Sequence, residues 1–416
     1  MIKEDIYNKI NKIKQMKLAI NMERGWPSKE QLELSLPMLD MVTSKTNLLR
    51  EVDYRGYAGT GGIVPLKHLF ADMLSVDIEN VYIGGTMSTT IMYDIIEKMC
   101  SLGKDGNPPW NELENVKFIC PSPGYEKHFK ICKRFNITML PVPMNQDGPD
   151  MDIVEKMVID DCSIKGIWCV PLYSNPTGIV YSDEVVRRLA NMQTAARDFI
   201  IMWDNAYCVH HLTKNKYTIL NILDECTKAG QKDRVFEFTS TSKITFPGAG
   251  VGVCASSVDN IKWLENNSLL QLKTGDKINQ LRHYLFLQNM DVVHRHMEKH
   301  AAIIKPKFDL IDKKLRCELR EIKGINWNNP KGGYFMHIEL LPHMAKAVWM
   351  KCKELGVSIT PAGSTYPYGI DPQDSTIRLA PTYLSLKEIS VAMDVFCCVV
   401  KLVYLKNKTG GSYSEC

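Results

Sequence analysis

The chain has 416 residues, of which 45% are hydrophobic and 24% are charged, so its composition excludes a disordered or fibrous protein. Lys and Arg number 51 against 47 Asp and Glu, and the net charge of +4 is too small to indicate nucleic acid or an anionic membrane as a partner. The sequence contains no run of about 18 apolar residues, the length that a bilayer-spanning helix requires. These observations predict a soluble globular protein of two or three domains, at about 150 residues per domain.

The 13 cysteines are scattered and include no Cys-x-x-Cys pair, the spacing that brings two thiolates onto one zinc ion. Unpaired thiols in this number suit a reducing compartment, where they pack as small apolar side chains. Residues 1–5 carry two acids, and the start of the chain lacks the arrangement of a secretion signal, a basic n-region followed by an uninterrupted apolar core. The sequence therefore predicts a cytoplasmic protein with no metal site.

The first predicted element is an amphipathic helix over residues 1–20. Its apolar residues recur at spacings of three and four, at Ile2, Ile6, Ile10, Ile13 and Met16. This spacing predicts one apolar face that packs on the body of the protein. A Gly-rich segment at residues 54–62 is expected to be an exposed loop, because it lacks the Gly-Lys-Ser/Thr ending of nucleotide-binding phosphate loops.

Between residues 80 and 257, short apolar runs alternate with helical stretches. The runs are Val81–Ile83, Val116–Cys120, Ile137–Pro141, Gly166–Leu172, Phe199–Trp203, Val235–Phe238 and Val251–Ala255. They are almost continuous in apolar residues, as expected for parallel strands that helices cover on both faces. We therefore predict an α/β fold whose large domain is built on a mostly parallel, seven-stranded sheet.

Residues 258–315 are predicted to form long helices, and the rest of the chain a smaller α+β domain. The expected strands of the smaller domain are Tyr334–Glu339, Val357–Thr360 and Ile377–Ala380. The predicted division has three parts. Residues 1–50 belong to the small domain, residues 51–290 form the large domain, and residues 291–416 complete the small domain.

Polar residues stand directly after three of the predicted strands, where open α/β sheets bind ligands. They are Ser174–Gly178, Asp204–Tyr207 and Ser240–Lys243. A buried lysine, an acid on a neighbouring strand and nearby hydroxyls are what a pyridoxal phosphate site requires. The lysine forms the Schiff base, the acid keeps the pyridine nitrogen protonated, and hydroxyls and free backbone N–H groups bind the phosphate.

These segments resemble fold-type I pyridoxal-phosphate aminotransferases, most closely the aspartate aminotransferase Ic group, relatives of the aminotransferase-like half of MocR-type regulators. The motifs are Asn-Pro-Thr-Gly from Asn175, Trp-Asp-Asn-Ala-Tyr from Trp203, Ser-Thr-Ser-Lys-Ile-Thr-Phe-Pro-Gly-Ala-Gly from Ser240, and a late arginine, Arg378. The resemblance runs from Arg24–Ser28 to Ile377–Pro381 and so covers nearly the whole chain. It implies pyridoxal 5'-phosphate as cofactor, amino acid and 2-oxo acid substrates, and a homodimer.

The resemblance also implies roles for individual residues. Lys243 matches the lysine that binds the cofactor and later moves the proton at the substrate Cα. Asp204 matches the partner of the pyridine nitrogen, and Asn175 and Tyr207 match the pair that hydrogen-bonds the ring hydroxyl oxygen. Tyr125 matches the aromatic residue that stacks on the pyridine ring.

The phosphate is expected in a cup formed by a helix start and the lysine loop, with Gly85, Thr86, Met87, Ser88, Ser240 and Ser242. Tyr57 matches a tyrosine that reaches the phosphate of the neighbouring subunit in these dimers. Arg378 matches the arginine that binds the substrate α-carboxylate through two parallel hydrogen bonds. Gly25 lies where the family closes an N-terminal segment over the substrate, and Asn175 is expected to contact the substrate too.

Two positions depart from the wider pattern. Most class I aminotransferases have a phosphate-binding arginine shortly after the lysine, and residues 246–250 contain none, a feature that the Ic group shares. Many Ic members have a lysine where Trp26 stands. The resemblance favours aspartate and glutamate as donors with 2-oxoglutarate as acceptor, while Trp26 keeps aromatic or aliphatic donors as an alternative.

Two further patterns imitate functional motifs. The run Gly-Ala-Gly-Val-Gly-Val from Gly248 mimics a dinucleotide fingerprint, but its sixth position is valine and it follows the lysine loop. His294, His296 and His300 share one predicted helix with basic residues interleaved and no accompanying metal motif, so we expect a solvated basic helix.

Fold alone does not settle the reaction. A lyase or another aminotransferase on the same scaffold is the nearest alternative to this transaminase. A cofactor-binding sensor without turnover, as in MocR-type regulators, is the alternative from a different class. Those regulators carry a DNA-binding extension, and because the resemblance here begins by Arg24, we expect the enzyme.

Overall fold

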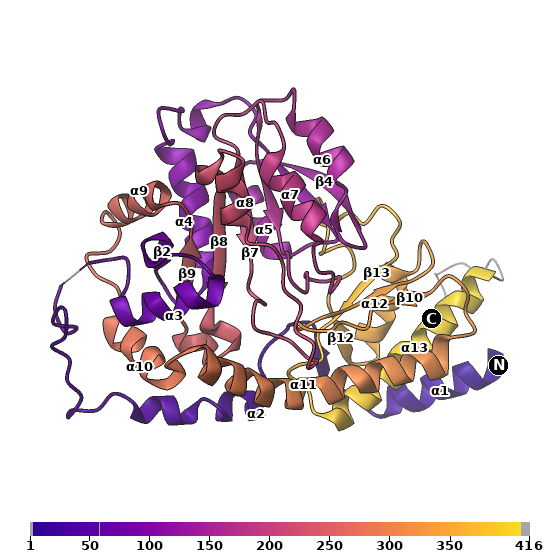
Figure 1. Cartoon of the computed structure of the whole chain (residues 1–416). Coiled ribbons are helices and arrows are strands. Elements are labelled where there is room, and N and C mark those ends of the chain that lie inside the picture. The colour runs from indigo at the N-terminus through magenta and orange to yellow at the C-terminus, as the bar shows by residue number, and fades with distance from the viewer. Residues whose placement is uncertain (1–2, 58, 409–416) are drawn as a thin grey trace.

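The computed structural model describes residues 3–57 and 59–408 and shows two lobes joined by one long helix (Figure 1). The larger lobe holds a sheet of eight strands in the order β2-β9-β8-β7-β6-β3-β4-β5. These strands are β2 (Val81–Ile83), β3 (Lys117–Ser122), β4 (Thr138–Asn145), β5 (Gly148–Pro149), β6 (Ile164–Cys169), β7 (Ile200–Asp204), β8 (Val235–Ser240) and β9 (Gly252–Ala255).

Most of this sheet is parallel. β3 pairs in parallel with β4 and β6, β6 with β7 and β7 with β8, whereas β9 runs antiparallel to β8 and β2. All seven predicted runs form strands of this one sheet, which confirms the expected α/β fold. The eighth strand, β5, adds two residues at the edge, antiparallel to β4. A segment this short shows no sequence period, so the sequence did not predict it.

Helices cover both faces of the sheet, as near-continuous apolar strands require. One face packs against α4 (Ser88–Ser101), α5 (Glu126–Arg134) and α9 (Val258–Ser268). The other face packs against α3 (Val64–Leu74), α6 (Met151–Val158), α7 (Asp183–Asn191), α8 (Ile222–Lys228) and α10 (Lys277–Leu287). Side chains of β7 alternate between these cores, because Met202 lies in the first and Ile201 and Trp203 lie in the second.

The smaller lobe is an α+β unit built from both ends of the chain (Figure 1). An antiparallel sheet contains β10 (Asn326–Trp327), β11 (Met336–Glu339) and β13 (Thr376–Leu379), and β1 (Ile20–Met22) pairs in parallel with β12 (Val357–Ile359). The helices of this lobe include α1 (Lys3–Gln15), α12 (Ala345–Glu354) and α13 (Leu386–Lys408). The three strands expected in this part of the sequence are present.

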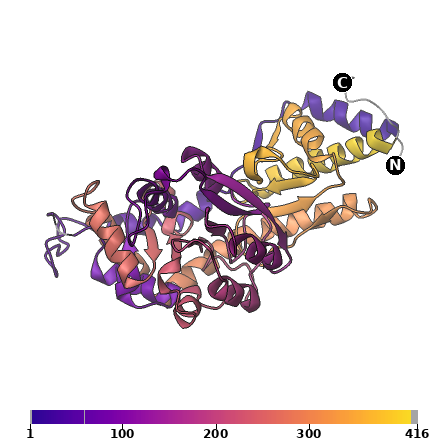
Figure 2. The same cartoon turned by 90° about the horizontal axis from the view of Figure 1, so that it is seen from above.

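The opening helix packs against the end of the chain. In α1, Ile6 and Ile10 are buried in the core that also holds one side of α13, and the two helices lie side by side in both views (Figures 1 and 2). The predicted amphipathic helix is therefore confirmed. It ends at Gln15, so Met16 lies beyond it and is exposed, and Ile2 lies outside the described residues.

The helix that joins the lobes is α11 (Met290–Leu319). Its first turns place Val293 and Met297 in a core of the larger lobe, and its later turns place Phe308 and Leu315 in the core of the smaller lobe. The short helix α2 (Lys29–Glu33) lies against it. None of the helices in the described part of the chain combines the length and apolarity that a bilayer-spanning segment requires.

Candidate active site

Lys243 lies in a short helical turn directly after β8, and its side chain lies beside two aromatic rings. The Nζ atom lies 5.0 Å from the ring centroid of Tyr207 and 5.9 Å from that of Tyr334. The turn is fixed by Thr241, whose Oγ1 accepts a hydrogen bond from the Val251 N–H at 2.9 Å. Burial lowers the pKa of Lys243, and the charge of Asp204 only partly opposes this shift.

A cavity of about 90 Å³ opens beside this lysine. It is lined by Met87, Ser88, Thr89, Tyr125, Val170, Asn175, Asp204, Ala206, Tyr207, Ser240, Ser242 and Lys243. These residues come from the segments that follow β2, β3, β6, β7 and β8, so the cavity lies at the edge where the parallel strands have their carboxyl ends. This is the edge at which open α/β sheets bind ligands.

Asp204, the last residue of β7, presents one satisfied and one unsatisfied oxygen. His128 Nε2 lies 3.0 Å from Oδ2 and donates to it, while Oδ1 is buried with no hydrogen-bond partner among the described residues. The His128 ring is itself held by stacking on Trp168, with centroids 4.3 Å apart. A buried carboxylate oxygen without a donor is costly, and a protonated ring nitrogen in the cavity would satisfy it.

Hydroxyl groups and a helix start lie at another part of the same cavity. Ser240 Oγ and Ser242 Oγ are 2.8 Å apart, and Ser88 is the first residue of α4. Free N–H groups at a helix N-terminus favour an anion, and a phosphate accepts bonds from hydroxyls as well. None of the residues that line the cavity is an arginine, so an anion here depends on these hydroxyl and backbone donors.

Arg378 reaches this region from β13 in the smaller lobe and is almost completely buried. Its Nη1 donates to Asn175 Oδ1 at 3.0 Å, which ties it to the cavity wall. Its Nε donates to Thr360 Oγ1 at 3.1 Å, and its Nη1 and Nη2 donate to the two carboxylate oxygens of Glu126 at 2.7 and 3.2 Å. The guanidinium group also lies 4.7 Å from the ring centroid of Phe335.

The remaining predicted site residues lie outside the cavity wall. Gly25 packs on Phe335, since a Cβ atom at Gly25 would come within 2.7 Å of the Phe335 ring, and the Arg378 guanidinium group lies against the same ring. Gly85 has a φ of +67° in the turn that leads into α4, and Thr86 follows it. Tyr57 is 83% exposed and touches no part of the cavity of its own chain.

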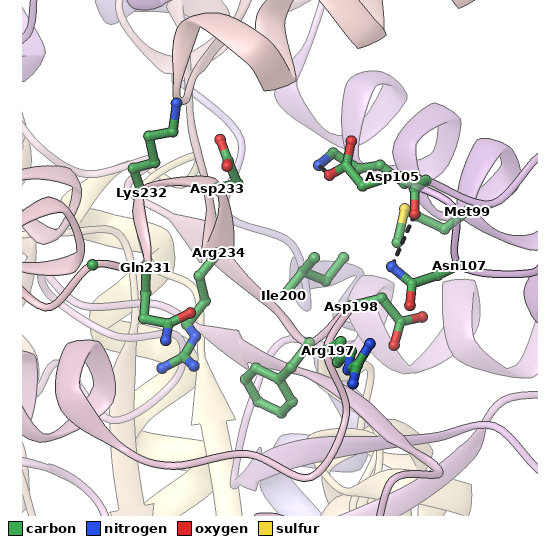
Figure 3. Close-up of a pocket in the computed structure, with 13 residues that line it drawn as sticks. Met99, Asp105, Asn107, Arg197, Asp198, Ile200, Gln231, Lys232, Asp233 and Arg234 are labelled. Atoms are coloured by element: carbon green, nitrogen blue, oxygen red, sulfur yellow. Dashed lines mark hydrogen bonds and ion pairs between the residues drawn. The ribbon is translucent and has the colours of Figure 1, made fainter.

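A second cavity, of about 190 Å³, lies at the opposite edge of the same sheet (Figure 3). Ile200 lines it at the start of β7, and Arg234 lines it directly before β8. Its buried charges already have partners. Arg234 donates to two main-chain carbonyls at 2.9 and 3.2 Å, and Asp198 accepts from Lys165 Nζ at 2.6 Å. Satisfied groups of this kind are typical of structural packing, so the cavity beside Lys243 is the candidate active site.

A family model described as aspartate amino-transferase matches residues 2–411. The chain is also 40% identical to the aspartate aminotransferase of Corynebacterium glutamicum over 400 residues, which covers 95% of this chain and 92% of that one. The chain belongs to the aspartate aminotransferase family.

Solved structures agree with this assignment. That of an aspartate transaminase from Corynebacterium glutamicum is similar to this aminotransferase with a TM-score of 0.95 at 40% identity, covering 97% of this chain and 96% of that one. The α-aminoadipate aminotransferase of Thermus thermophilus, solved with N-(5'-phosphopyridoxyl)-L-leucine, shares the fold at a TM-score of 0.76 and 19% identity. The match covers 96% of this chain and 95% of that one. The protein is a pyridoxal-phosphate-dependent transaminase, which confirms the expected family, enzyme class and cofactor.

Several residues that shape the site of this aminotransferase were not predicted. Glu126 and His128 both follow Tyr125, and their contacts with Arg378 and Asp204 join segments far apart in sequence. Thr89, Val170 and Ala206 line the cavity. Val170 lies inside the predicted strand Gly166–Leu172, and Ala206 lies in the segment Asp204–Tyr207 that follows a predicted strand, so position relative to the strands was the available signal for these two.

The expectation of a solvated basic helix around the histidines is wrong for one face of α11. His296 and His300 are buried, and their Nε2 atoms are 3.1 Å apart. His296 Nε2 also lies 2.8 Å from the carbonyl oxygen of Ile244, and His300 Nδ1 lies 3.0 Å from Gln31 Nε2. The interleaved basic residues are exposed, so the histidine face packs behind the lysine loop. Residues 3–57 and 59–408 contain no group of three His, Cys, Asp or Glu side chains placed to hold a metal ion.

Proposed function

We propose that this transaminase uses the cavity beside Lys243 and that its preferred substrates are aspartate or glutamate with 2-oxoglutarate. One observation carries the proposal. The lysine, the half-satisfied carboxylate of Asp204 and Asn175 line a single cavity, and Asn175 is hydrogen-bonded to the buried arginine Arg378. The site therefore combines a nucleophilic amine, a partner for a protonated ring and a cation for a carboxylate.

The lining residues fit pyridoxal phosphate group by group. Asp204 Oδ1 would accept from the pyridine nitrogen, and Asn175 and Tyr207 would bind the ring hydroxyl oxygen. Tyr125 would lie against the ring. Bound there, the cofactor supplies the electron sink that makes loss of the Cα proton feasible.

The phosphate would be held by hydroxyl and backbone donors. We assign this role to Gly85, Thr86, Met87, Ser88, Ser240 and Ser242. Four of these residues line the cavity, namely Met87, Ser88, Ser240 and Ser242. The first N–H groups of α4 have no intrahelical partner and are free to point at an anion. These donors replace the arginine that other class I enzymes use.

Lys243 is suited to carry the proton. Burial lowers its pKa, so the free amine is more accessible near neutral pH than that of a solvated lysine. With the cofactor and substrate bound, the uncharged Nζ of Lys243 would accept the proton from the substrate Cα and return it. The rings of Tyr207 and Tyr334 lie beside this atom.

Arg378 is proposed to bind the substrate α-carboxylate, and Trp26 to influence the side chain. Trp26 is half exposed, its ring meets Tyr383 edge-on at 6.0 Å, and the Arg24 guanidinium lies 5.4 Å from its centroid. The cation of Arg24 beside Trp26 favours an acidic side chain. The aromatic pair formed by Trp26 and Tyr383 favours aromatic or aliphatic donors as the second candidate.

A homodimer is proposed because Tyr57 and other large hydrophobic side chains are exposed. Leu49 is 65% and Leu270 is 83% exposed, and both belong to segments at the same end of the larger lobe (Figure 1). Exposed apolar patches mark protein interfaces. In the dimer Tyr57 would contact the phosphate in the partner's cavity. The division at residues 1–50, 51–290 and 291–416 and the cytoplasmic location stay predictions.

A turnover panel tests the substrate assignment. Aspartate, glutamate, aromatic and aliphatic amino acids are each supplied with 2-oxoglutarate, and kcat/KM is compared. We expect aspartate or glutamate to lead. Aromatic donors faster by more than about tenfold, roughly 1.4 kcal/mol in barrier, would reverse the order. No transamination with any pair, despite bound cofactor, would overturn the assignment of the site.

A further inference from the structure

The guanidinium group of Arg378 is already occupied by a carboxylate of its own chain. Glu126 is the first residue of α5, and its two oxygens accept from Nη1 and Nη2 of Arg378 at 2.7 and 3.2 Å. This is the two-point geometry with which an arginine binds any carboxylate. The pair joins the two lobes, because α5 belongs to the larger lobe and β13 to the smaller one.

Too few donors remain on Arg378 for a second carboxylate. A guanidinium group has five N–H donors. Four of them are used in the structure, two by Glu126, one by Asn175 Oδ1 and one by Thr360 Oγ1. The remaining N–H on Nη2 cannot form two parallel bonds by itself. A substrate α-carboxylate that binds Arg378 at two points must therefore take the donors that Glu126 holds.

The position of Glu126 allows its carboxylate to leave the hydrogen bonds that it accepts from Arg378. Its side chain is 23% exposed, whereas that of Arg378 is 3% exposed, so the carboxylate can turn toward solvent while the arginine stays in place. Lys130 lies one turn further along the same helix face and offers an alternative cation. The helix N-terminus also stabilises the negative charge of Glu126 when it is unpaired.

We propose that Glu126 competes with the substrate α-carboxylate for Arg378, holding the arginine in the empty site and leaving it when substrate binds. This inference rests on the proposed role of Arg378 as the carboxylate-binding residue. Two consequences follow from the competition. A ligand without a carboxylate cannot displace Glu126, so the competition favours carboxylate ligands. Each bound carboxylate also binds less tightly than it would to a free arginine, which favours release of product.

The test measures binding without turnover in the holoenzyme. Succinate and 3-phenylpropionate, carboxylates that cannot react, are titrated while the absorbance of the bound cofactor is followed. In Glu126→Gln we expect the Kd of whichever probe binds the wild-type protein to fall about tenfold, that is about 1.4 kcal/mol. KM for the amino donor should fall with it, while kcat is unchanged or lower. Glu126→Ala is the second variant, because glutamine can still accept one hydrogen bond.

Glu184→Gln is the matched control, since Glu184 is an exposed acid in the first turn of α7 and is remote from the cavity. We expect it to leave Kd and KM unchanged. A Kd in both Glu126 variants that is unchanged or higher than in the wild type would overturn the proposal. A higher value would mean that Glu126 positions Arg378 instead of competing for it.

Arg378→Met separates this inference from the function on which it rests. If Arg378→Met binds the probes as well as the wild type does, the proposed role of Arg378 is wrong. If Arg378→Met loses binding but the Glu126 variants do not tighten it, only the competition is wrong. The double variant completes the cycle, because Glu126→Gln should have no effect on probe binding once Arg378 is removed.

Discussion

Nε2 of His128 lies 3.0 Å from Oδ2 of Asp204, while Oδ1 of the same buried carboxylate has no hydrogen-bond partner among the described residues. The imidazole is fixed by stacking on Trp168. One side of the carboxylate is therefore oriented by the protein, and the other is left for a donor in the cavity. An oriented carboxylate binds a protonated ring more tightly than one that must first be immobilised.

His128→Phe tests this arrangement, because phenylalanine keeps a ring on Trp168 but removes the N–H. We expect cofactor affinity to fall by about 1.5–3 kcal/mol, the usual contribution of a hydrogen bond to a charged group. Equilibrium dialysis of the cofactor measures the change, and the thermal midpoint of the apoprotein reports on folding. Unchanged affinity in a folded variant would mean that His128 is only a packing residue.

Lys243→Ala should retain the cofactor but lose turnover by several orders of magnitude, because the proposed proton carrier is removed while the proposed phosphate and ring contacts remain. Borohydride reduction of the wild-type holoenzyme followed by peptide mapping should place the label on Lys243. Lys127→Ala, at an exposed position of α5, is the control and should keep full labelling. A label on any other lysine contradicts the assignment.

The proposed contact of Tyr57 with the phosphate in the partner subunit predicts that each active site needs residues from both chains. A Lys243→Ala chain and a Tyr57→Phe chain should each be weak alone. Their heterodimer would have one site with both defects and one with neither, so subunit exchange should restore activity toward half that of the wild type. Proven heterodimers that regain no activity would show that Tyr57 does not act across the interface.

Arg378→Lys should weaken every amino acid substrate, since a single ammonium cannot reproduce the two parallel bonds of a guanidinium. We expect a loss of about 2–5 kcal/mol in kcat/KM that is similar across donors. Trp26→Lys should instead change the order of donors and improve acidic ones. The same turnover panel measures both variants. A donor-dependent loss in Arg378→Lys would assign that residue to the side chain.

Stability should fall as the pH falls below about 6.5. Burial lowers the pKa of His283 to about 4, and burial with the nearby His296 lowers that of His300 to about 3. Unfolded histidines titrate near 6.5, so between these values the unfolded chain binds protons that the folded chain does not. At pH 5 each of these two histidines therefore lowers the free energy of unfolding by on the order of 2 kcal/mol, relative to its value well above pH 6.5.

Urea unfolding between pH 5 and pH 7 measures this dependence. His283→Gln should be less stable at pH 7, because His283 Nε2 lies 2.9 Å from Thr245 Oγ1 and 3.1 Å from Thr241 Oγ1. Its stability should vary less with pH than that of the wild type. His68→Asn, at an exposed position, is the control and should keep the wild-type slope. An unaltered slope in His283→Gln would contradict the prediction.

The sequence by itself determined the features that depend on neighbouring residues. Apolar runs predicted seven strands of the large sheet, because burial on both faces removes polar residues locally. The polar segments after these runs placed Asn175, Asp204 and Lys243 at one edge, since parallel strands end on the same side. The amphipathic spacing of α1 was also readable, because one helix face determines its own period.

Tertiary structure decided the rest, because contacts between distant segments leave no local pattern. The pair between Glu126 and Arg378 joins positions 252 residues apart, and it forms only because α5 and β13 meet between the lobes. The burial of His296 and His300 was missed for the same reason. A helix face becomes interior when another segment covers it, and here the lysine loop and Gln31 cover it. Local composition sets what a segment can bury, while the packing of other segments decides what it does bury.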